Sequence, residues 1–198
     1  MGNLPLLVLI SGPPGAGKST LAGALSAQLE LPLLSIDLVK SGVAFTMTGG
    51  VFDDDRVTRI GGPAGQTAFL ATYELVNVCL RHGVSLVLEK AWYRGLSEAE
   101  LRQFLPISRA VQVHVTASLP VAVQRFMDRP SRWGAAATAR MAEVKHRLQT
   151  GTLTWDDFAP LDLGIPLHLV ATDDGQPIDL VPIEDFINKA VASARPTG

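Results

Sequence analysis

The sequence has little cysteine, no excess of either charge and no long apolar run, and each shortage excludes a class of protein. The single cysteine, Cys79, cannot form an internal disulfide and matches no metal-ligand spacing, which favours a reducing, cytoplasmic location. Lysine and arginine number 17 against 19 acidic residues, so the formal charge of -2 disfavours non-specific binding to nucleic acid or to anionic lipid. No stretch reaches the ~18 apolar residues of a membrane span.

The distribution of apolar residues indicates an α/β fold. Hydrophobic residues make up 47% of the 198, enough for the core of one domain spanning residues 1–198. Short apolar runs alternate with longer amphipathic stretches, as in a parallel sheet covered by helices. Strands are expected at 6–10, 33–36, 84–89, 110–117 and 167–172, and helices at 18–30, 63–81, 97–104, 120–128, 135–149 and 183–194. The sequence therefore predicts a three-layer domain with a five-stranded parallel sheet.

A glycine-rich motif directly follows the first expected strand. Residues 11–20, Ser-Gly-Pro-Pro-Gly-Ala-Gly-Lys-Ser-Thr, contain G-x-x-x-x-G-K-[ST] between an apolar run and a helical pattern, which defines a P-loop or Walker A motif. The glycines let successive backbone amides point at an anion, and the following helix adds the positive end of its dipole. The residues expected to bind nucleoside triphosphate are Gly12, Pro13, Pro14, Gly15, Ala16, Gly17, Lys18, Ser19 and Thr20.

Two of these residues have expected roles in chemistry. Lys18 would place its charge on the β and γ phosphates, and the Ser19 hydroxyl would be a ligand of Mg²⁺ bridging the same groups. GTPase motifs are missing, because the pair Asn188-Lys189 is not followed by the aspartate of [NT]-K-x-D and no D-x-x-G occurs. The chain is also short for an AAA-type machine. A small phosphotransferase remains.

The order of these motifs resembles the small P-loop kinases. The P-loop is followed by Asp37 just after the second strand and by Arg125 and Arg129 after the fourth. This arrangement is similar to chloramphenicol phosphotransferase-like, zeta-toxin-like and polynucleotide-kinase-like proteins, and the likeness covers most of the chain. It implies ATP and Mg²⁺ as cofactors and transfer of the γ-phosphate to an alcohol group.

Two carboxylates stand at strand ends, where open α/β sheets bind ligands. The resemblance implies that Asp37 orients the attacking hydroxyl or accepts its proton, although an aspartate here is also a favoured helix N-cap. Glu89 ends the third strand, where many P-loop proteins place a carboxylate of the magnesium shell. A salt-bridged strand end is the alternative for Glu89.

Two arginines after the fourth expected strand are candidates for a segment that closes over the nucleotide. Arg125 and Arg129 are four residues apart and share one helix face. The resemblance implies a lid at about residues 125–150 whose arginines close over the triphosphate, with Arg132 and Arg140 as weaker candidates. A solvated helix face is the alternative. The loop at 172–177, after the fifth strand, is expected to lie against adenine.

An acceptor-side segment is expected at about residues 38–66. Its glycine-rich stretch has the character of a long loop that holds substrate, with Phe45 and Phe52 in the pocket and residues 53–55 as a solvated acidic turn. Three to five residues after Glu89 come Trp92, Tyr93 and Arg94, which offer flat apolar surface and a cation to an acceptor. Core packing is the alternative for Trp92. No role is assigned to the four histidines.

The sequence thus predicts an ATP-dependent phosphotransferase whose acceptor is a small molecule, such as an antibiotic, nucleoside or sugar derivative. One alternative is a kinase of polynucleotide 5′-hydroxyls, which the acidic balance disfavours because a nucleic-acid strand needs a basic track. The other alternative is a nucleotide-gated regulatory protein that transfers no phosphate to an acceptor. The sequence names neither the acceptor nor the oligomeric state.

Overall fold

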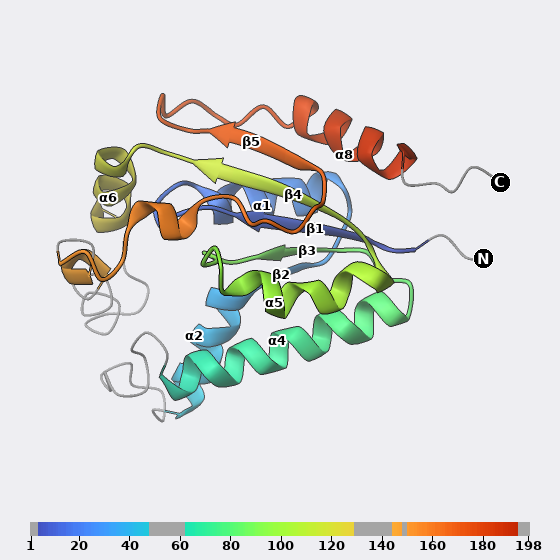
Figure 1. The fold of residues 1–198 in the computed structure, drawn as a ribbon, viewed down its shortest axis with the longest axis horizontal. Helices are drawn as coiled ribbons and strands as arrows, with labels where there is room; N and C mark the ends of the chain where they lie inside the picture. Colours follow the sequence, from blue (N-terminus) through green and yellow to red (C-terminus); the bar gives the residue numbers. More distant parts are fainter. Residues whose placement is uncertain (1–3, 48–61, 129–143, 148–149, 194–198) are drawn as a thin grey trace.

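The computed structural model describes residues 4–47, 62–128, 144–147 and 150–193. The elements in chain order are β1 (Leu6–Ser11), α1 (Lys18–Gln28), β2 (Leu33–Ser35), α2 (Ile36–Met47), α4 (Pro63–Arg81), β3 (Leu86–Glu89), α5 (Ser97–Leu101), the 3-10 helix η1 (Arg102–Ile107), β4 (Arg109–Thr116), α6 (Leu119–Asp128), the 3-10 helix η2 (Trp155–Phe158), β5 (Leu167–Ala171) and α8 (Val181–Ser193). The strands form one parallel sheet in the order β2-β3-β1-β4-β5, with helices on both faces (Figure 1). The predicted α/β architecture is confirmed.

The central strand β1 is buried on both faces, which explains its unbroken apolar sequence. Successive side chains of a strand point to opposite faces. Val8 and Ile10 accordingly pack in one core with α1 and α8, whereas Leu7 and Leu9 pack in a second core with α4, α5 and η1. This burial fixes the strand under the P-loop and so holds the start of that loop in place.

Residues 36–47 form helix α2, so the interpretation of the start of the acceptor-side segment as a loop was wrong, and a helix at this point was indicated only by the N-cap alternative for Asp37. Ile36, Lys40 and Ala44 are buried at intervals of four residues and form the stripe that faces the molecule. Gly42 in the helix interior and the glycines that follow at 49 and 50 suggested a loop. The predicted acceptor residue Phe52 and the acidic turn at 53–55 lie outside the described residues.

Two further segments differ from expectation. The expected helix 97–104 is a short α5 that continues as η1, with Pro106 inside the 3-10 turn. Of the expected helix 135–149 only residues 144–147 are described, and they are helical. The lid at about 125–150 therefore stays a prediction beyond the end of α6. Among the described helices, none is long and apolar enough to cross a membrane.

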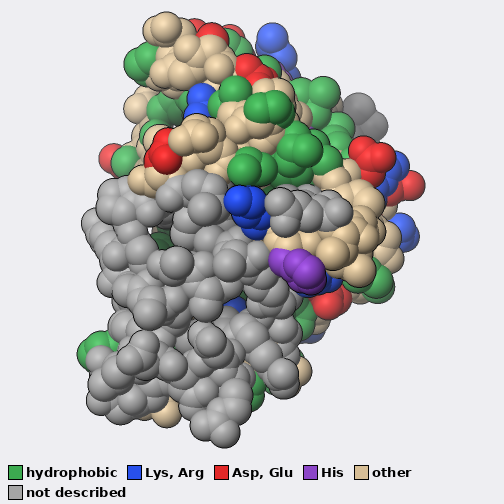
Figure 2. Space-filling view, turned by 90° about the vertical axis from the view of Figure 1, so that its left-hand side faces the viewer, with side chains coloured by type: hydrophobic (Ala, Val, Ile, Leu, Met, Phe, Trp, Pro, Cys, Tyr) green, Lys and Arg blue, Asp and Glu red, His purple; other side chains and the backbone are tan. Residues whose placement is uncertain are grey.

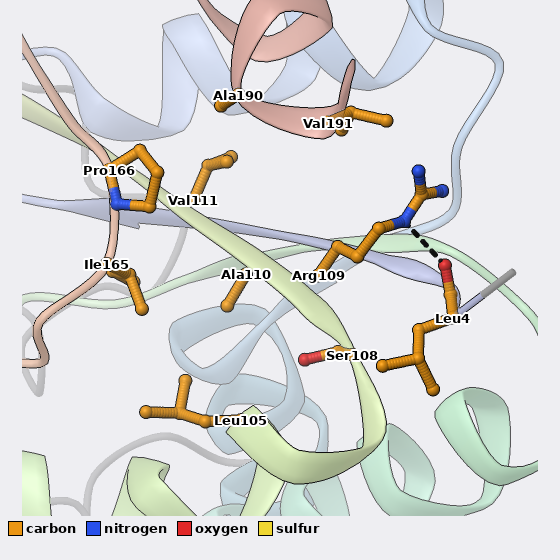
Figure 3. A pocket seen from close by; sticks show the side chains of 10 residues that line it. All are labelled: Leu4, Leu105, Ser108, Arg109, Ala110, Val111, Ile165, Pro166, Ala190 and Val191. Carbon is orange, nitrogen blue, oxygen red and sulfur yellow. Dashed lines mark hydrogen bonds between the residues drawn. The ribbon is translucent and has the colours of Figure 1, made fainter. Parts of the chain in front are cut away.

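A small pocket lies at the amino end of the sheet, away from the P-loop. Its volume is about 260 Å³, and it lies between the start of β4 and the end of α8 (Figure 3). Arg109 Nε at its edge donates to the Leu4 carbonyl at 2.7 Å. Because ligands of open α/β sheets bind at the carboxyl ends of strands, this pocket is separate from the predicted site.

Candidate active site

The P-loop connects β1 to α1 and takes the backbone shape that its glycines allow. Gly12, Gly15 and Gly17 have φ values of 133°, 80° and 94°, in the region that side chains disfavour. The loop ends at Gly17, the N-cap of α1, which leaves the amides at the helix start directed outward. Lys18 is buried and donates from Nζ to the Pro13 carbonyl at 2.8 Å, so its ammonium lies within the curl of the loop.

Close packing explains two of these glycines. A Cβ on Gly12 would collide with the carbonyl oxygen of Val115 in β4, and one on Gly15 would collide with the carbonyl oxygen of Ala122 in α6. The backbones of β4 and α6 therefore press directly on the loop. This contact places α6, which carries Arg125, against the expected phosphate site.

Substituting Gly15 with alanine is expected to lower the melting temperature and to remove ATP binding. A side chain with positive φ costs about 1–2 kcal/mol, and the collision with the Ala122 carbonyl adds to that cost. Gly23 is the matched control, because it lies inside α1 with nothing within 4 Å of an added Cβ. Gly23→Ala should instead stabilise the fold by about 0.5–1 kcal/mol. Calorimetric unfolding and ATP titration of both variants test this, and equal effects would contradict it.

Glu89 is buried at the end of β3 and bridges two serines. Its Oε2 accepts from Ser35 Oγ at 2.6 Å, and its Oε1 lies 3.3 Å from Ser19 Oγ. Burial raises the pKa of Glu89, while the charge of Lys18 and the serine hydrogen bonds lower it. Mg²⁺ prefers oxygen ligands, and one carboxylate and one hydroxyl can bind it while phosphate oxygens and water fill the remaining coordination positions. Ser19 and Glu89 therefore fit the predicted metal.

Asp37 is exposed in the first turn of α2, next to the end of β2. Its charge contributes to raising the pKa of Glu89 and favours the charged form of Lys90, so the three groups share one neighbourhood. The structure thus brings Asp37, Glu89 and the P-loop together at the carboxyl ends of β1, β2 and β3. An exposed carboxylate at this point is accessible to a substrate hydroxyl.

Arg125 of α6 is tied to the segment after β5. Its Nη1 donates to Thr172 Oγ1 at 3.0 Å and its Nη2 to the Thr172 carbonyl at 2.5 Å. The Thr172 hydroxyl in turn donates to the carbonyl of Ala16 at 2.9 Å, which links the arginine to the P-loop through one residue. Arg129, the other predicted lid arginine, and Arg132 and Arg140 lie outside the described residues.

A buried polar cluster beneath the P-loop was missed in the sequence. Ser11 ends β1 and is paired in register with His114 of β4, whose Nδ1 lies 2.9 Å from Ser11 Oγ. Gln112 lies two residues before His114 and therefore points to the same face. In the orientation in which both side-chain atoms of Gln112 have partners, its nitrogen donates to the Leu161 carbonyl at 3.1 Å. Its oxygen then accepts from Ser11 Oγ at 2.8 Å and from the backbone amide of Leu161 at 3.0 Å. His114 then donates to Ser11, which donates to Gln112.

His114 is expected to make stability fall in weak acid. Burial, followed by the charge of Lys18, lowers the pKa of His114 to about 4 from 6.5. The unfolded chain therefore binds more protons between pH 6.5 and about 4, and the free energy of unfolding falls as pH drops, by up to about 1.4 kcal/mol per unit. Urea unfolding from pH 7 to 4 should be flatter for His114→Gln. Replacing the exposed His82 with glutamine should leave the slope unchanged, and equal slopes in all three proteins would refute this.

The predicted acceptor residues are distributed between surface and core. Phe45 is 49% exposed on α2, and Arg94 is exposed after β3. Tyr93 is half-buried, with its ring centroid 5.2 Å from that of Phe158. Trp92 is only 1% exposed and donates from its indole nitrogen to the Ile10 carbonyl at 3.2 Å. This burial corrects the expectation of a direct Trp92 contact with substrate, because the ring fills the core.

Comparisons with known proteins identify the family of the chain. The model of the family "chloramphenicol phosphotransferase-like protein" matches residues 6–154. The adenylyl-sulfate kinase of Shewanella baltica (strain OS195) is 32% identical over 132 residues, or 63% of this chain, and the match spans 58% of that enzyme.

Solved structures share the fold. A protein of Chloroflexus aurantiacus J-10-fl, described as a candidate kinase, is 29% identical with a TM-score of 0.74 and covers 94% of this chain and 98% of its own. A sugar kinase from Janibacter sp. HTCC2649 has the same fold at 16% identity, with a TM-score of 0.53 and coverage of 96% and 93%. Because the family model extends from β1 to the residue before η2, the chain belongs to the chloramphenicol phosphotransferase-like family and is a P-loop kinase.

Proposed function

We propose that this kinase transfers the γ-phosphate of ATP to an alcohol group of a small molecule. The observation that carries the proposal is the meeting of Lys18, Ser19, Glu89 and Asp37 at the carboxyl ends of neighbouring strands. Phosphoryl transfer depends on positioning and on neutralising charge, and these four groups supply both.

The nucleotide end of the site is built from the P-loop. Its amides and the Lys18 ammonium would surround the β and γ phosphates, while the Thr172 segment would lie against adenine. Ser19 and Glu89 would hold Mg²⁺, which supplies neutralisation of the phosphate charge when bound. Glu89 is kept in place for this by Ser35, whose hydroxyl bonds its other oxygen at 2.6 Å.

The arginines would close the site from the other side. Arg125 already lies against Thr172, one hydrogen bond from the P-loop carbonyl of Ala16. A guanidinium in that place can reach phosphate oxygens with two parallel donors. Arg129, one turn further along the sequence, is proposed for the same task.

The acceptor would approach Asp37. The exposed carboxylate of Asp37 would orient the attacking hydroxyl and accept its proton as the bond to the γ phosphorus forms and the bond to the leaving ADP oxygen breaks. Tyr93 and Arg94 follow β3 at the same edge of the sheet, and Phe45 lies near the end of α2. These residues are proposed as the acceptor contacts.

The overall charge balance, 17 lysines and arginines against 19 acidic residues, favours a small acceptor over a nucleic-acid strand. On the face at the carboxyl ends of the strands, the described lysine and arginine side chains are scattered among hydrophobic and acidic ones (Figure 2). A strand acceptor needs a continuous basic track to follow its phosphates. The family also favours transfer over a purely regulatory role, since its model is that of a phosphotransferase-like protein.

A transfer screen tests the proposal. The chain is incubated with [γ-³²P]ATP and Mg²⁺ against nucleosides, sugars and sugar acids, aminocyclitols, phenylpropanoid antibiotics and short oligonucleotides. We expect stoichiometric labelling of a small hydroxylated product. Labelling of oligonucleotides alone would establish the polynucleotide alternative, and release of phosphate without any labelled acceptor would establish the regulatory one.

A further inference from the structure

Lys90 occupies an aromatic slot at the edge of the proposed acceptor site. It directly follows Glu89, and its backbone amide lies 3.4 Å from the Ile10 carbonyl, so it continues the β1–β3 ladder. Its ammonium lies 5.0 Å from the ring centroid of Phe69 on α4 and 5.0 Å from that of Trp92. Both distances are within the range of cation–π attraction.

The slot is rigid. Trp92 is 1% exposed and is fixed by its hydrogen bond to Ile10. Tyr73 contacts both rings of the slot, with its ring centroid 4.1 Å from that of Phe69 and 6.4 Å from that of Trp92. The core tryptophan therefore acts as the floor on which the Lys90 side chain lies.

The ammonium of Lys90 lacks polar partners in the described part of the chain. It makes no hydrogen bond there and has no carboxylate within 4.0 Å, and the aromatic faces do not replace the three acceptors that an ammonium takes in water. Burial lowers the pKa of Lys90, while the charges of Glu100 and Asp37 raise it. The two ring faces attract the cation but leave its hydrogen-bond donors unused, and an oxyanion can accept from them.

We propose that Lys90 is a specificity residue that binds a carboxylate, sulfate or phosphate carried by the acceptor close to its reactive hydroxyl. The inference rests on the proposed function, since it takes Asp37 as the group that receives that hydroxyl. Ser35 and Glu89 are paired in register across β2 and β3. Asp37 and Lys90 follow these two residues by two and one positions, so they lie at the same edge of the sheet and one small molecule can reach both. The acceptor is then an acidic hydroxylated compound, and cationic aminocyclitols are poor substrates.

Matched acceptor pairs test this assignment. Each pair differs in an oxyanion: D-gluconate and D-glucitol, D-glycerate and glycerol, adenylyl sulfate and adenosine. We expect the wild-type chain to favour the anionic member by about 10- to 100-fold in kcat/KM, the value of one charge-assisted hydrogen bond. Lys90→Met should bring the ratio close to one, mainly by raising KM for the anion, and Lys90→Arg should keep the preference. Lys189→Met on α8 is the control and should change nothing.

A binding measurement separates this inference from the transfer reaction. Lysines are labelled biosynthetically with ¹³C at Cε, which leaves every ammonium group unmodified, and the Lys90 signal is identified by its loss in Lys90→Met. With a non-hydrolysable ATP analogue and Mg²⁺ present, the Lys90 signal should shift with the anionic probes and not with their neutral partners.

The outcomes are distinct. Equal use of both members of each pair, or a preference that survives in Lys90→Met, would overturn the role of Lys90 while transfer stands. If no probe is phosphorylated, transfer to this class of acceptor fails. The Lys90 signal is then the remaining test of the anion site. A shift with the anionic probes and not with the neutral ones supports the site, and an unchanged signal overturns it. Thermal unfolding of each variant confirms that the fold persists.

Discussion

Replacing Lys18 with alanine is expected to reduce phosphoryl transfer by at least about 10²-fold, the usual effect of removing one preorganised group that stabilises transition-state charge. The Lys18 ammonium is buried in the P-loop, 2.8 Å from the Pro13 carbonyl, so no water-exposed cation can take its place. Its charge also counteracts the burial that raises the pKa of Glu89. Initial rates with labelled ATP and the acceptor found in the screen measure the loss.

The control for Lys18 is Lys189, an exposed lysine on α8 beside Pro166. Lys189→Ala should retain the full rate, and both variants should keep the circular dichroism of the parent. A Lys18→Ala variant that is folded and turns over at the parental rate would show that the P-loop does not deliver the phosphate.

Changing Asp37 to asparagine is expected to lower kcat by about 10²- to 10⁴-fold and to leave the Kd for ATP nearly unchanged. General base groups contribute about this much, and asparagine keeps the shape of the side chain but cannot take the proton. Because Asp37 is exposed and lies outside the P-loop, we expect its substitution to affect the transfer step more than nucleotide binding. Single-turnover kinetics give the first quantity and titration calorimetry with ATP gives the second.

An exposed aspartate far from the sheet edge is the control for Asp37. Asp185 lies on α8, and Asp185→Asn should behave like the parent in both measurements. Full turnover by Asp37→Asn with the identified acceptor would remove the assignment of the base. A loss of ATP affinity equal to the loss of rate would instead place Asp37 in the nucleotide site.

The local elements were predictable where one physical signal dominates. Helix α4 has the predicted bounds, Pro63–Arg81, because a proline starts it and its buried positions recur at helical spacing. The strand β1 and the P-loop were predictable because an unbroken apolar run leads into glycines that the turn requires. Helix α2 was missed because the glycine in its interior and the glycines after it indicated a loop more strongly than its few buried positions indicated a helix.

The sequence predicted which site residues stand at strand ends, but it did not predict which of them contact one another. Glu89 and Ser35 are paired in register across β2 and β3, and this pairing puts the serine hydroxyl on the carboxylate. The pairing of Ser11 with His114 likewise creates the buried cluster beneath the loop. Strand order and register arise from contacts between residues that are 54 and 103 positions apart, and no local pattern encodes them.

The sequence by itself determined that this chain is an α/β protein with a phosphate-binding loop, because glycine geometry and apolar periodicity act over a few neighbouring residues. Only the tertiary structure decided that Trp92 is the floor of a slot and that Lys90 lies on it, close to Asp37. The burial of a side chain depends on which distant helices and strands cover it. For the same reason only the structure shows that the lysine after β3 lies against two aromatic rings.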